Sequence, residues 1–284
     1  MKYELSPMFK ADLHTHSYFS DGSFSPEELV DLAVKNSLNG LSITDHDTTD
    51  AYSRLIPYAK EKNLPLISGI EISSSYKGVP IHILGYGFKL SHPSIISIEE
   101  MQKKRRFVRN QGLIERLNKK GIDLTQEEVL SLFPHPPSQL GRPHIAKALL
   151  NRGVISSIQE AFSRYIGEGK SCYIPSITPT IEEVIDHIHQ AGGLAILAHP
   201  HLIRANHLIT NILDHPFDGL EGYYGTLSPK KDQKWVNIAS SKGWTITGGS
   251  DFHGDTKPNQ PIASSWTNMT TFTLLEEKFN ENLS

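Results

Sequence analysis

Short apolar runs alternate along the chain with longer stretches of helical periodicity. The runs predict strands at residues 9–13, 41–44, 66–69, 80–84, 194–198, 219–221 and 245–247. Helices are expected between most of them, and the first has clear signals: Ser25 as N-cap, Pro26 in the first turn and Gly40 after its end. This alternation is typical of parallel βα units. The pattern therefore predicts an α/β fold, and the polar residues gathered after the strands favour a barrel over an open sheet.

The alternation lapses between residues 94 and 170. Strand signals are few there, and a helical pattern begins with a basic run, Lys103 to Arg109. Such a run is usually a solvated helix face, although it could guide an RNA strand near the barrel mouth. The chain returns through an extended, proline-marked stretch at residues 173–179. We predict a barrel domain formed by residues 1–93 and 171–284, interrupted by a mainly helical insertion at 94–170 that caps the substrate site.

Composition narrows the class of protein. Of 284 residues 38% are hydrophobic, enough for a full core, and 28 Lys and Arg against 31 Asp and Glu leave a net charge of -3. That balance gives no global field for a polyanion, so any contact with nucleic acid must be local. A single cysteine, Cys172, excludes an internal disulfide framework. The opening residues lack an apolar leader segment and no long apolar run follows, so we expect a cytoplasmic protein without membrane contact.

Histidine is abundant, with 14 residues, and several follow directly after predicted strands. In the first motif His14 and His16 are two positions apart on a strand and can face the same side. Such a pair alone is most often two half-buried strand residues, but five further strand ends carry similar chemistry. Together they deliver nine candidate metal ligands to one barrel mouth: His14, His16, Asp21, His46, Glu71, His82, His199, Asp251 and His253.

This ligand set has a definite chemical preference. Imidazole and carboxylate groups without thiolate favour manganese, iron or zinc, and nine ligands are too many for one ion. We therefore expect two to three ions. A bridging carboxylate would hold neighbouring ions about 3.5 to 4 Å apart, a spacing that suits displacement at phosphorus.

The order of the motifs resembles the polymerase and histidinol phosphatase (PHP) family. The motifs are DLHTHS at residues 12–17, TDHD at 44–47, GIE at 69–71, a mid-chain His82, AHP at 198–200 and GSDFH at 249–253. The resemblance spans nearly the whole chain, and it implies a distorted (βα)7 barrel, similar to a TIM barrel, with a trinuclear metal site in which manganese is the most favoured ion.

The resemblance also implies how the ligands divide. His14, His16 and Asp251 would hold one metal, and Glu71 would bridge it to a second. The remaining assignments place His82 and His199 on the second metal, and Asp21, His46 and His253 on the third. Glu71 and His199 are the residues we expect to take part directly in catalysis.

The insertion points to one branch of the family. The segment LGRPHIA at residues 140–146, with GEGK at 167–170, is similar to enzymes that remove the 3′-phosphate from nucleoside 3′,5′-bisphosphates, a branch that includes 5′-to-3′ exoribonucleases acting on short RNA. Arg142 offers a planar fork to a phosphate, His144 a second donor, and Lys170 a further contact. The plain alternative is a loop before a helix with a solvated Arg142. The motif AHP also continues here with His201 rather than with the Gly-Arg of related sequences, which leaves the exact substrate open.

Two other functions compete. Histidinol-phosphate phosphatase is another activity in the family, and a non-catalytic metal-binding module that scaffolds a polymerase belongs to a different class. The Gly-Arg-Pro-His pattern argues against histidinol-phosphate phosphatase, and the complete set of nine ligands argues against a non-catalytic module. We expect a nucleotide or a short RNA as the substrate and no obligate protein partner.

Overall fold

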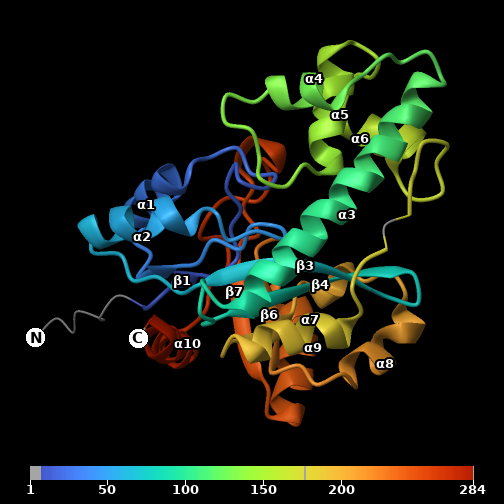
Figure 1. Cartoon of the computed structure of the whole chain (residues 1–284). Coiled ribbons are helices and arrows are strands. Elements are labelled where there is room, and N and C mark those ends of the chain that lie inside the picture. The colour runs from blue at the N-terminus through green and yellow to red at the C-terminus, as the bar shows by residue number, and fades with distance from the viewer. Residues whose placement is uncertain (1–7, 176, 284) are drawn as a thin grey trace, which may run out of the picture.

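A computed structural model describes residues 8–175 and 177–283, and it has a mixed α/β fold (Figure 1). The first seven residues, which belong to the N-terminal stretch where we expect no leader segment, lie outside the described residues. Ser176, inside the predicted extended stretch 173–179, lies outside them as well. Among the described residues, no helix is both long enough and apolar enough to cross a bilayer.

The strands form two hydrogen-bonded sheets. One is a parallel pair, β1 (Ala11–Asp12) and β2 (Gly40–Leu41). The other has five strands in the order β3–β4–β5–β6–β7. Its members are β3 (Gly69–Tyr76), β4 (Val79–Tyr86), β5 (Leu194–Leu197), β6 (Gly219–Tyr224) and β7 (Thr245–Gly249). Strand β4 runs antiparallel to both neighbours, whereas β5, β6 and β7 are parallel.

Each predicted strand overlaps an observed one, but the described residues form no closed barrel of parallel strands. The turn between β3 and β4 explains one departure. Lys77 and Gly78 have φ angles of 49° and 81°, which make a tight hairpin in place of a helical crossover and force β4 to run antiparallel. Isolated bridges pair Leu41 with Leu66 and His46 with Glu71.

Helices cover the sheets as the alternation predicts. Those outside the insertion are α1 (Pro26–Lys35), α2 (Tyr52–Glu61), α7 (Ile181–Gln190), α8 (Ile209–Leu213), α9 (Pro229–Lys242) and α10 (Met269–Leu283). The start of α1 is confirmed, since Ser25 accepts from the backbone N–H of Glu28 and the Glu28 side chain accepts in return from Ser25. Short 3₁₀ turns lie at Pro200–Leu202, Asn206–Leu208 and Gly254–Thr256.

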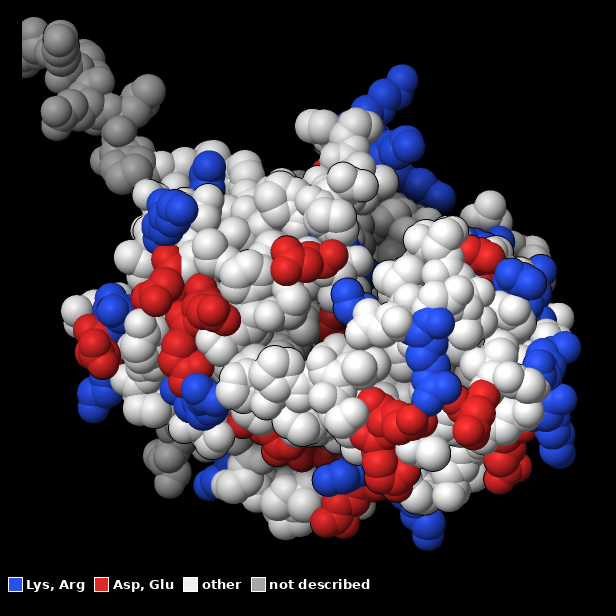
Figure 2. Space-filling model, turned by 90° about the horizontal axis from the view of Figure 1, so that it is seen from above, with Lys and Arg blue, Asp and Glu red and all other residues white. Residues whose placement is uncertain are grey.

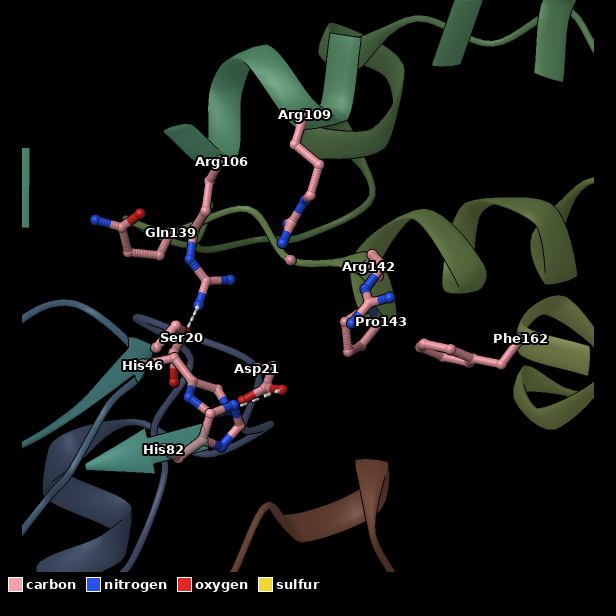
Figure 3. A pocket seen from close by; sticks show the side chains of 12 residues that line it. Ser20, Asp21, His46, His82, Arg106, Arg109, Gln139, Arg142, Pro143 and Phe162 are labelled. Atoms are coloured by element: carbon pink, nitrogen blue, oxygen red, sulfur yellow. Dashed lines mark hydrogen bonds and ion pairs between the residues drawn. The ribbon is translucent and has the colours of Figure 1, made fainter. Parts of the chain in front are cut away.

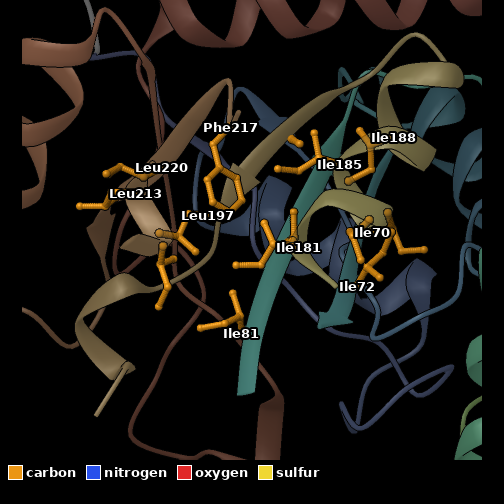
Figure 4. Close-up of a cluster of buried hydrophobic side chains, with 14 of the residues drawn as sticks. Ile70, Ile72, Ile81, Ile181, Ile185, Ile188, Leu197, Leu213, Phe217 and Leu220 are labelled. Carbon is orange, nitrogen blue, oxygen red and sulfur yellow. The ribbon is translucent and has the colours of Figure 1, made fainter. Parts of the chain in front are cut away.

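The main core lies where α7 packs on β3, β4 and β5 (Figure 4). Ile70 and Ile81 come from the strands, and Ile185 and Ile188 come from the helix; each is fully buried or nearly so. Burying each such side chain contributes about 1.5 to 3 kcal/mol. Gly85 permits the close approach, because a Cβ at this position would lie 3.1 Å from Ile188. This packing fixes the strands whose ends carry the candidate ligands.

Residues 94–170, called here the helical segment, form a lobe beside the sheets. Its helices are α3 (Pro93–Asn118), α4 (Gln126–Ser131), α5 (Arg142–Asn151) and α6 (Ile158–Ala161), followed by a π-helical turn at Phe162–Ile166. In Figure 1 the long helix α3 rises from the sheet to meet α4, α5 and α6. The lobe has a core of its own, in which Leu113, Val129 and Leu149 are fully buried. The domain boundaries stay a prediction.

Candidate metal centre and phosphate pocket

Glu71 lies at the centre of a histidine cluster. Its Oε1 is 2.9 Å from His82 Nδ1 and 2.8 Å from His199 Nε2. Its Oε2 is 3.0 Å from His46 Nδ1 and 3.3 Å from His16 Nε2. Glu71 and His82 come from adjacent strands, and the other histidines follow β1, β2 and β5. The fold thus brings distant motifs to one carboxylate.

Two further carboxylates complete the group. Asp251 Oδ1 is 3.4 Å from His14 Nε2 and 3.2 Å from His16 Nε2. Asp21 Oδ1 is 3.3 Å from His253 Nε2. All nine predicted ligands therefore lie in one cluster, while their assignment to individual ions stays a prediction.

Several ligand atoms in this cluster are buried without a hydrogen-bond partner. They are His14 Nε2, His16 Nε2, His46 Nδ1, His253 Nε2, Asp21 Oδ1 and Glu71 Oε2. Leaving such atoms unsatisfied costs free energy, which a bound cation would recover. Ligand atoms within 4.8 Å of one another form three overlapping groups: His16, Asp21, His46 and His253; His14, His16 and Glu71; and His46, Glu71 and His82. The residues fit divalent ions with nitrogen and oxygen ligands.

The electrostatics around Glu71, His46 and His16 favour the protonation states that metal binding needs. Burial would raise the pKa of Glu71, but the imidazoles around it, with His46 foremost, hold that pKa well below its usual range. Burial likewise lowers the pKa of His46 to about 4 and that of His16 well below its usual range. The carboxylate is therefore ionised and these two imidazoles are neutral at pH 7, as ligands must be. Burial would lower the pKa of His14 and of His82 as well, but nearby carboxylates, Glu221 for His14 and Glu71 for His82, raise both.

Glu221 contacts two of the candidate ligands, His14 and His199, without being a predicted ligand itself. It was not identified from the sequence. Its Oε1 is 2.9 Å from His14 Nδ1, and its Oε2 accepts from the backbone N–H of His199 at 2.8 Å. A carboxylate in this place fixes the ring orientation of His14, so that Nε2 faces the cluster. The available signal was a carboxylate at the end of the predicted strand 219–221.

Asp251 is held on its other side. Its Oδ2 accepts from Tyr224 Oη at 2.6 Å and from Lys257 Nζ at 2.9 Å. Asp251 and His199 have φ angles of 53° and 26°, in the region that non-glycine residues rarely adopt. Such strain persists only where surrounding contacts over-determine the backbone, and here it aims both side chains into the cluster.

A cavity of about 180 Å³ opens above the cluster (Figure 3). Asp21, His46 and His82 line one side of it. The helical segment supplies the opposite wall, which carries three guanidinium groups: Arg106 and Arg109 from α3, and Arg142 from α5. Burial and the charges of its two neighbours lower the pKa of Arg109 to about 9. The cavity therefore places concentrated positive charge opposite the candidate metal ligands.

The arginines are held in different ways. Asp47 binds Arg106 through two hydrogen bonds to its Oδ2, with Arg106 Nε at 2.7 Å and Nη2 as the second donor. Arg142 lies 5.9 Å from the ring of Phe162 and 5.6 Å from that of Tyr173. Within the described residues neither Arg142 nor Arg109 forms an ion pair with a carboxylate, so both keep charge for an anionic ligand.

The other predicted substrate contacts lie elsewhere. His144 is 5% exposed, and its Nδ1 accepts from the backbone N–H of Gly141 at 2.8 Å, which caps the start of α5. It is not part of the cavity wall. Lys170 is exposed and does not line the cavity either. Of the three predicted contacts, the structure brings only Arg142 to the cavity.

For Arg106 and Arg109 the structure corrects the first interpretation of the basic run, a solvated face, and agrees with the alternative that part of the run lies near the site. Lys103 and Lys104 are exposed, but the two arginines turn inward. The signal was their helical spacing. Residues 102, 106, 109, 113 and 117 follow one stripe of α3, which continues as the buried Leu113 and Leu117.

Comparison with known proteins agrees with these features. The PHP domain family matches residues 12–193. A 5′-3′ exoribonuclease from Haemophilus influenzae is 36% identical over 253 residues, which cover 86% of this chain and 90% of the relative. A 3′,5′-nucleoside bisphosphate phosphatase from Chromobacterium violaceum is 28% identical over 257 residues, or 87% of this chain and 88% of the relative.

Solved structures extend the likeness to the fold. A crystal structure from Bifidobacterium adolescentis, proposed to be a metal-dependent phosphoesterase, has a TM-score of 0.86 at 30% identity and covers 96% of this chain and 97% of its own. An amidohydrolase from Chromobacterium violaceum with bound sulfate has a TM-score of 0.83 at 26% identity, covering 95% and 96%. The chain therefore belongs to the PHP domain family and is a metal-dependent phosphoesterase of that family.

Proposed function

We propose that the chain removes the 3′-phosphate from nucleoside 3′,5′-bisphosphates, and that the same site acts on short RNA from its 5′ end. One observation carries this proposal: three of the candidate metal ligands, Asp21, His46 and His82, line a single cavity together with three arginines. A substrate with two phosphates matches that cavity, with the scissile phosphate at the ions and the 5′-phosphate at the guanidinium groups.

In both substrates the bond broken is the one between phosphorus and O3′. Water gives its hydroxyl to phosphorus and O3′ leaves with a proton. The bound ions, manganese by preference with iron or zinc as alternatives, would supply Lewis-acid charge to the phosphoryl oxygens and activate the water. We assign their binding to the nine clustered residues, with Glu71 as the bridging ligand and His199 beside it, as the pair most directly involved in catalysis.

The remaining residues position the substrate. Arg142, flanked by Phe162 and Tyr173, offers a planar fork to the 5′-phosphate. Arg106 and Arg109 add charge from α3. His144 acts through Arg142, because it caps the helix on which Arg142 is the first residue. In this proposal the helical segment caps the site, and Lys170 has no part in binding.

The alternatives are weaker on physical grounds. Histidinol phosphate carries an ammonium group, which three neighbouring guanidinium groups would repel. A scaffold module has no need of a cavity that joins metal ligands to Arg109 and Arg142, which have no carboxylate partner among the described residues. The relatives described as an exoribonuclease and as a bisphosphate phosphatase also support a nucleotide or RNA substrate.

A combined metal and substrate experiment tests the proposal. We expect two to three equivalents of metal per chain after loading, with manganese giving the highest activity. Phosphate release from adenosine 3′,5′-bisphosphate should be much faster than from adenosine 3′-monophosphate, which lacks the group that the arginines bind. Full activity in protein stripped of metal, or equal rates on the two nucleotides, would contradict it.

A further inference from the structure

A second groove, of about 520 Å³, lies beside the metal cluster and shares no lining residue with the cavity that the arginines line. Its walls are the turn that follows β5 and the first turns of α9. Residues on these walls include Pro200, His201, Asn206, Lys230, Lys231 and Lys234. All three lysines are exposed. We call this feature the lysine groove.

The lysine groove begins next to the metal ligands. Pro200 follows the ligand His199 in the chain. The ring of His201 is 4.3 Å from that of Tyr224, and Tyr224 Oη donates to the ligand Asp251 at 2.6 Å. The arginine cavity, in contrast, touches Asp21, His46 and His82. The two anion-attracting surfaces therefore meet the cluster at different ligands.

The chemistry of the groove is that of a polyanion site. Among the described residues that line it there are three lysines and no carboxylate. Lys234 Nζ lies 4.5 Å from the ring centroid of Trp235, which is 5% exposed and forms part of the wall. Both ring nitrogens of His201 are buried without a partner. On the face seen from above in Figure 2, basic and acidic side chains are mixed. The net charge of the chain is -3, so the three lysines of the groove do not reflect an overall positive charge.

A nucleoside bisphosphate has only two phosphates, and the ions and the arginines account for both. The lysine groove can therefore contact a phosphate of the substrate only if the substrate continues beyond the scissile phosphate. We propose that the lysine groove binds the phosphodiester backbone of single-stranded RNA on the 3′ side of the scissile bond. This inference rests on the proposed function and deepens it: the chain is built for oligonucleotides as well as for mononucleotides.

The test separates length dependence from catalysis. The variant Lys230→Gln/Lys231→Gln/Lys234→Gln removes three charges from the groove. A control variant, Lys35→Gln/Lys60→Gln/Lys119→Gln, removes three exposed lysines from α1, α2 and the end of α3. The kcat/KM of each protein is measured on a 5′-phosphorylated hexaribonucleotide and on adenosine 3′,5′-bisphosphate, between about 50 and 200 mM salt.

We expect the groove variant to lose about tenfold in kcat/KM on the hexanucleotide at the lower salt, and to keep its rate on the bisphosphate within twofold. The slope of the logarithm of kcat/KM for RNA against that of salt concentration should fall by about 2, since each lost phosphate contact on a single strand contributes roughly 0.7. The control variant should behave like the parent on both substrates.

Direct binding decides the inference independently of hydrolysis. Fluorescence anisotropy with a 3′-labelled hexanucleotide should give a weaker Kd for the groove variant than for the control. Equal Kd values for the two variants would overturn the groove assignment even if phosphate is still released from the bisphosphate. Competition by polyglutamate as strong as that by RNA would also overturn it, in favour of an acidic protein partner. Failure of the parent to hydrolyse either substrate would count against the proposed function, whereas loss of hydrolysis in the groove variant with RNA binding unchanged would count against the groove alone.

Discussion

The two walls of the arginine cavity are built differently. The wall that belongs to the sheets exposes three ligands of the metal cluster, and behind them the buried carboxylate of Glu221 fixes the ring of His14. The wall that belongs to the helical segment carries three arginines on two helices, held by one ion pair and by aromatic rings. Metal ligands need a preformed geometry, whereas a substrate must enter and leave. We infer that this difference in support reflects the two tasks.

Near the cavity, polar contacts join the two regions. Asp47 binds Arg106, Gln102 Nε2 donates to the backbone carbonyl of Ser73 at 2.5 Å, and Gln139 Nε2 donates to that of Asp47 at 3.1 Å. The start of α3 packs into the core of the sheets through Ile95 and Ile98, whereas the rest of the helical segment has a core of its own. Substitutions in the sheet wall should therefore affect metal binding and chemistry, and substitutions in the helical wall should affect substrate preference.

Glu71→Gln is expected to have the largest effect. The variant removes the charge shared by five imidazoles, so it should lose metal and more than 100-fold in activity. The fold should survive, because Glu71 belongs to the cluster and not to the apolar core. Metal analysis, phosphate release and circular dichroism measure the three quantities, with the exposed Glu61→Gln as control. Activity within about threefold of the parent would contradict the bridging role.

Arg142→Ala should have the next largest effect on activity, and mainly on the nucleoside 3′,5′-bisphosphate. Losing a charge-assisted, bidentate contact costs about 1.5 to 3 kcal/mol, or roughly 10- to 150-fold in kcat/KM on the bisphosphate. The 3′-monophosphate should lose much less, and metal content should not change. Arg152→Ala, at the other end of α5, is the matched control. Equal losses on both nucleotides would mean that Arg142 contacts the scissile phosphate instead.

The metal ligands could be predicted because short motifs carry them. A histidine or carboxylate directly after an apolar run is visible in the sequence, and strand ends converge in space. Arg106 could not be recognised in the same way, because the exposed Lys103 and Lys104 beside it made the whole run look solvated. Its inward direction depends on how α3 packs, which a basic run does not reveal.

The positions of the strands could be predicted from the sequence, but their directions could not. Apolar runs located all seven strands, but they do not encode strand direction, and the hairpin turn at Lys77 and Gly78 reversed β4. The role of His144 could not be predicted from its residue type either. Its type suggested a phosphate donor, while its place three residues after Gly141 made it a helix cap.

Asp47→Asn tests the junction between the walls and should have a moderate effect. Asp47 accepts two bonds from Arg106 and one from the Ser73 backbone N–H at 2.7 Å. Without its charge the guanidinium is less firmly placed, so KM for the bisphosphate should rise by about tenfold with a smaller change in kcat. Metal content checks the neighbouring ligand His46, and its loss would show that the variant disturbs the cluster instead. Asp50→Asn, which changes an exposed residue near the start of α2, is the control.

Glu99→Gln should have the smallest effect on activity and a distinct effect on stability. Glu99, on α3, accepts from the backbone N–H of Thr49 at 2.5 Å, and burial raises its pKa from 4.5 to about 7. Because the folded-state pKa lies above the unfolded value, the fold favours the neutral acid, and the parent loses stability as pH rises from about 4.5 to 7.

Glutamine stays neutral throughout that range, so the variant and the parent should have nearly equal free energies of unfolding at the acidic end. At pH 8 the variant should be the more stable, by on the order of 2 to 3 kcal/mol. Urea unfolding at a series of pH values measures the difference, with the exposed neighbour Glu100→Gln as control. A difference between variant and parent that does not change with pH would mean that the Glu99 carboxyl is ionised in the fold, and that the junction between the two walls tolerates a buried charge.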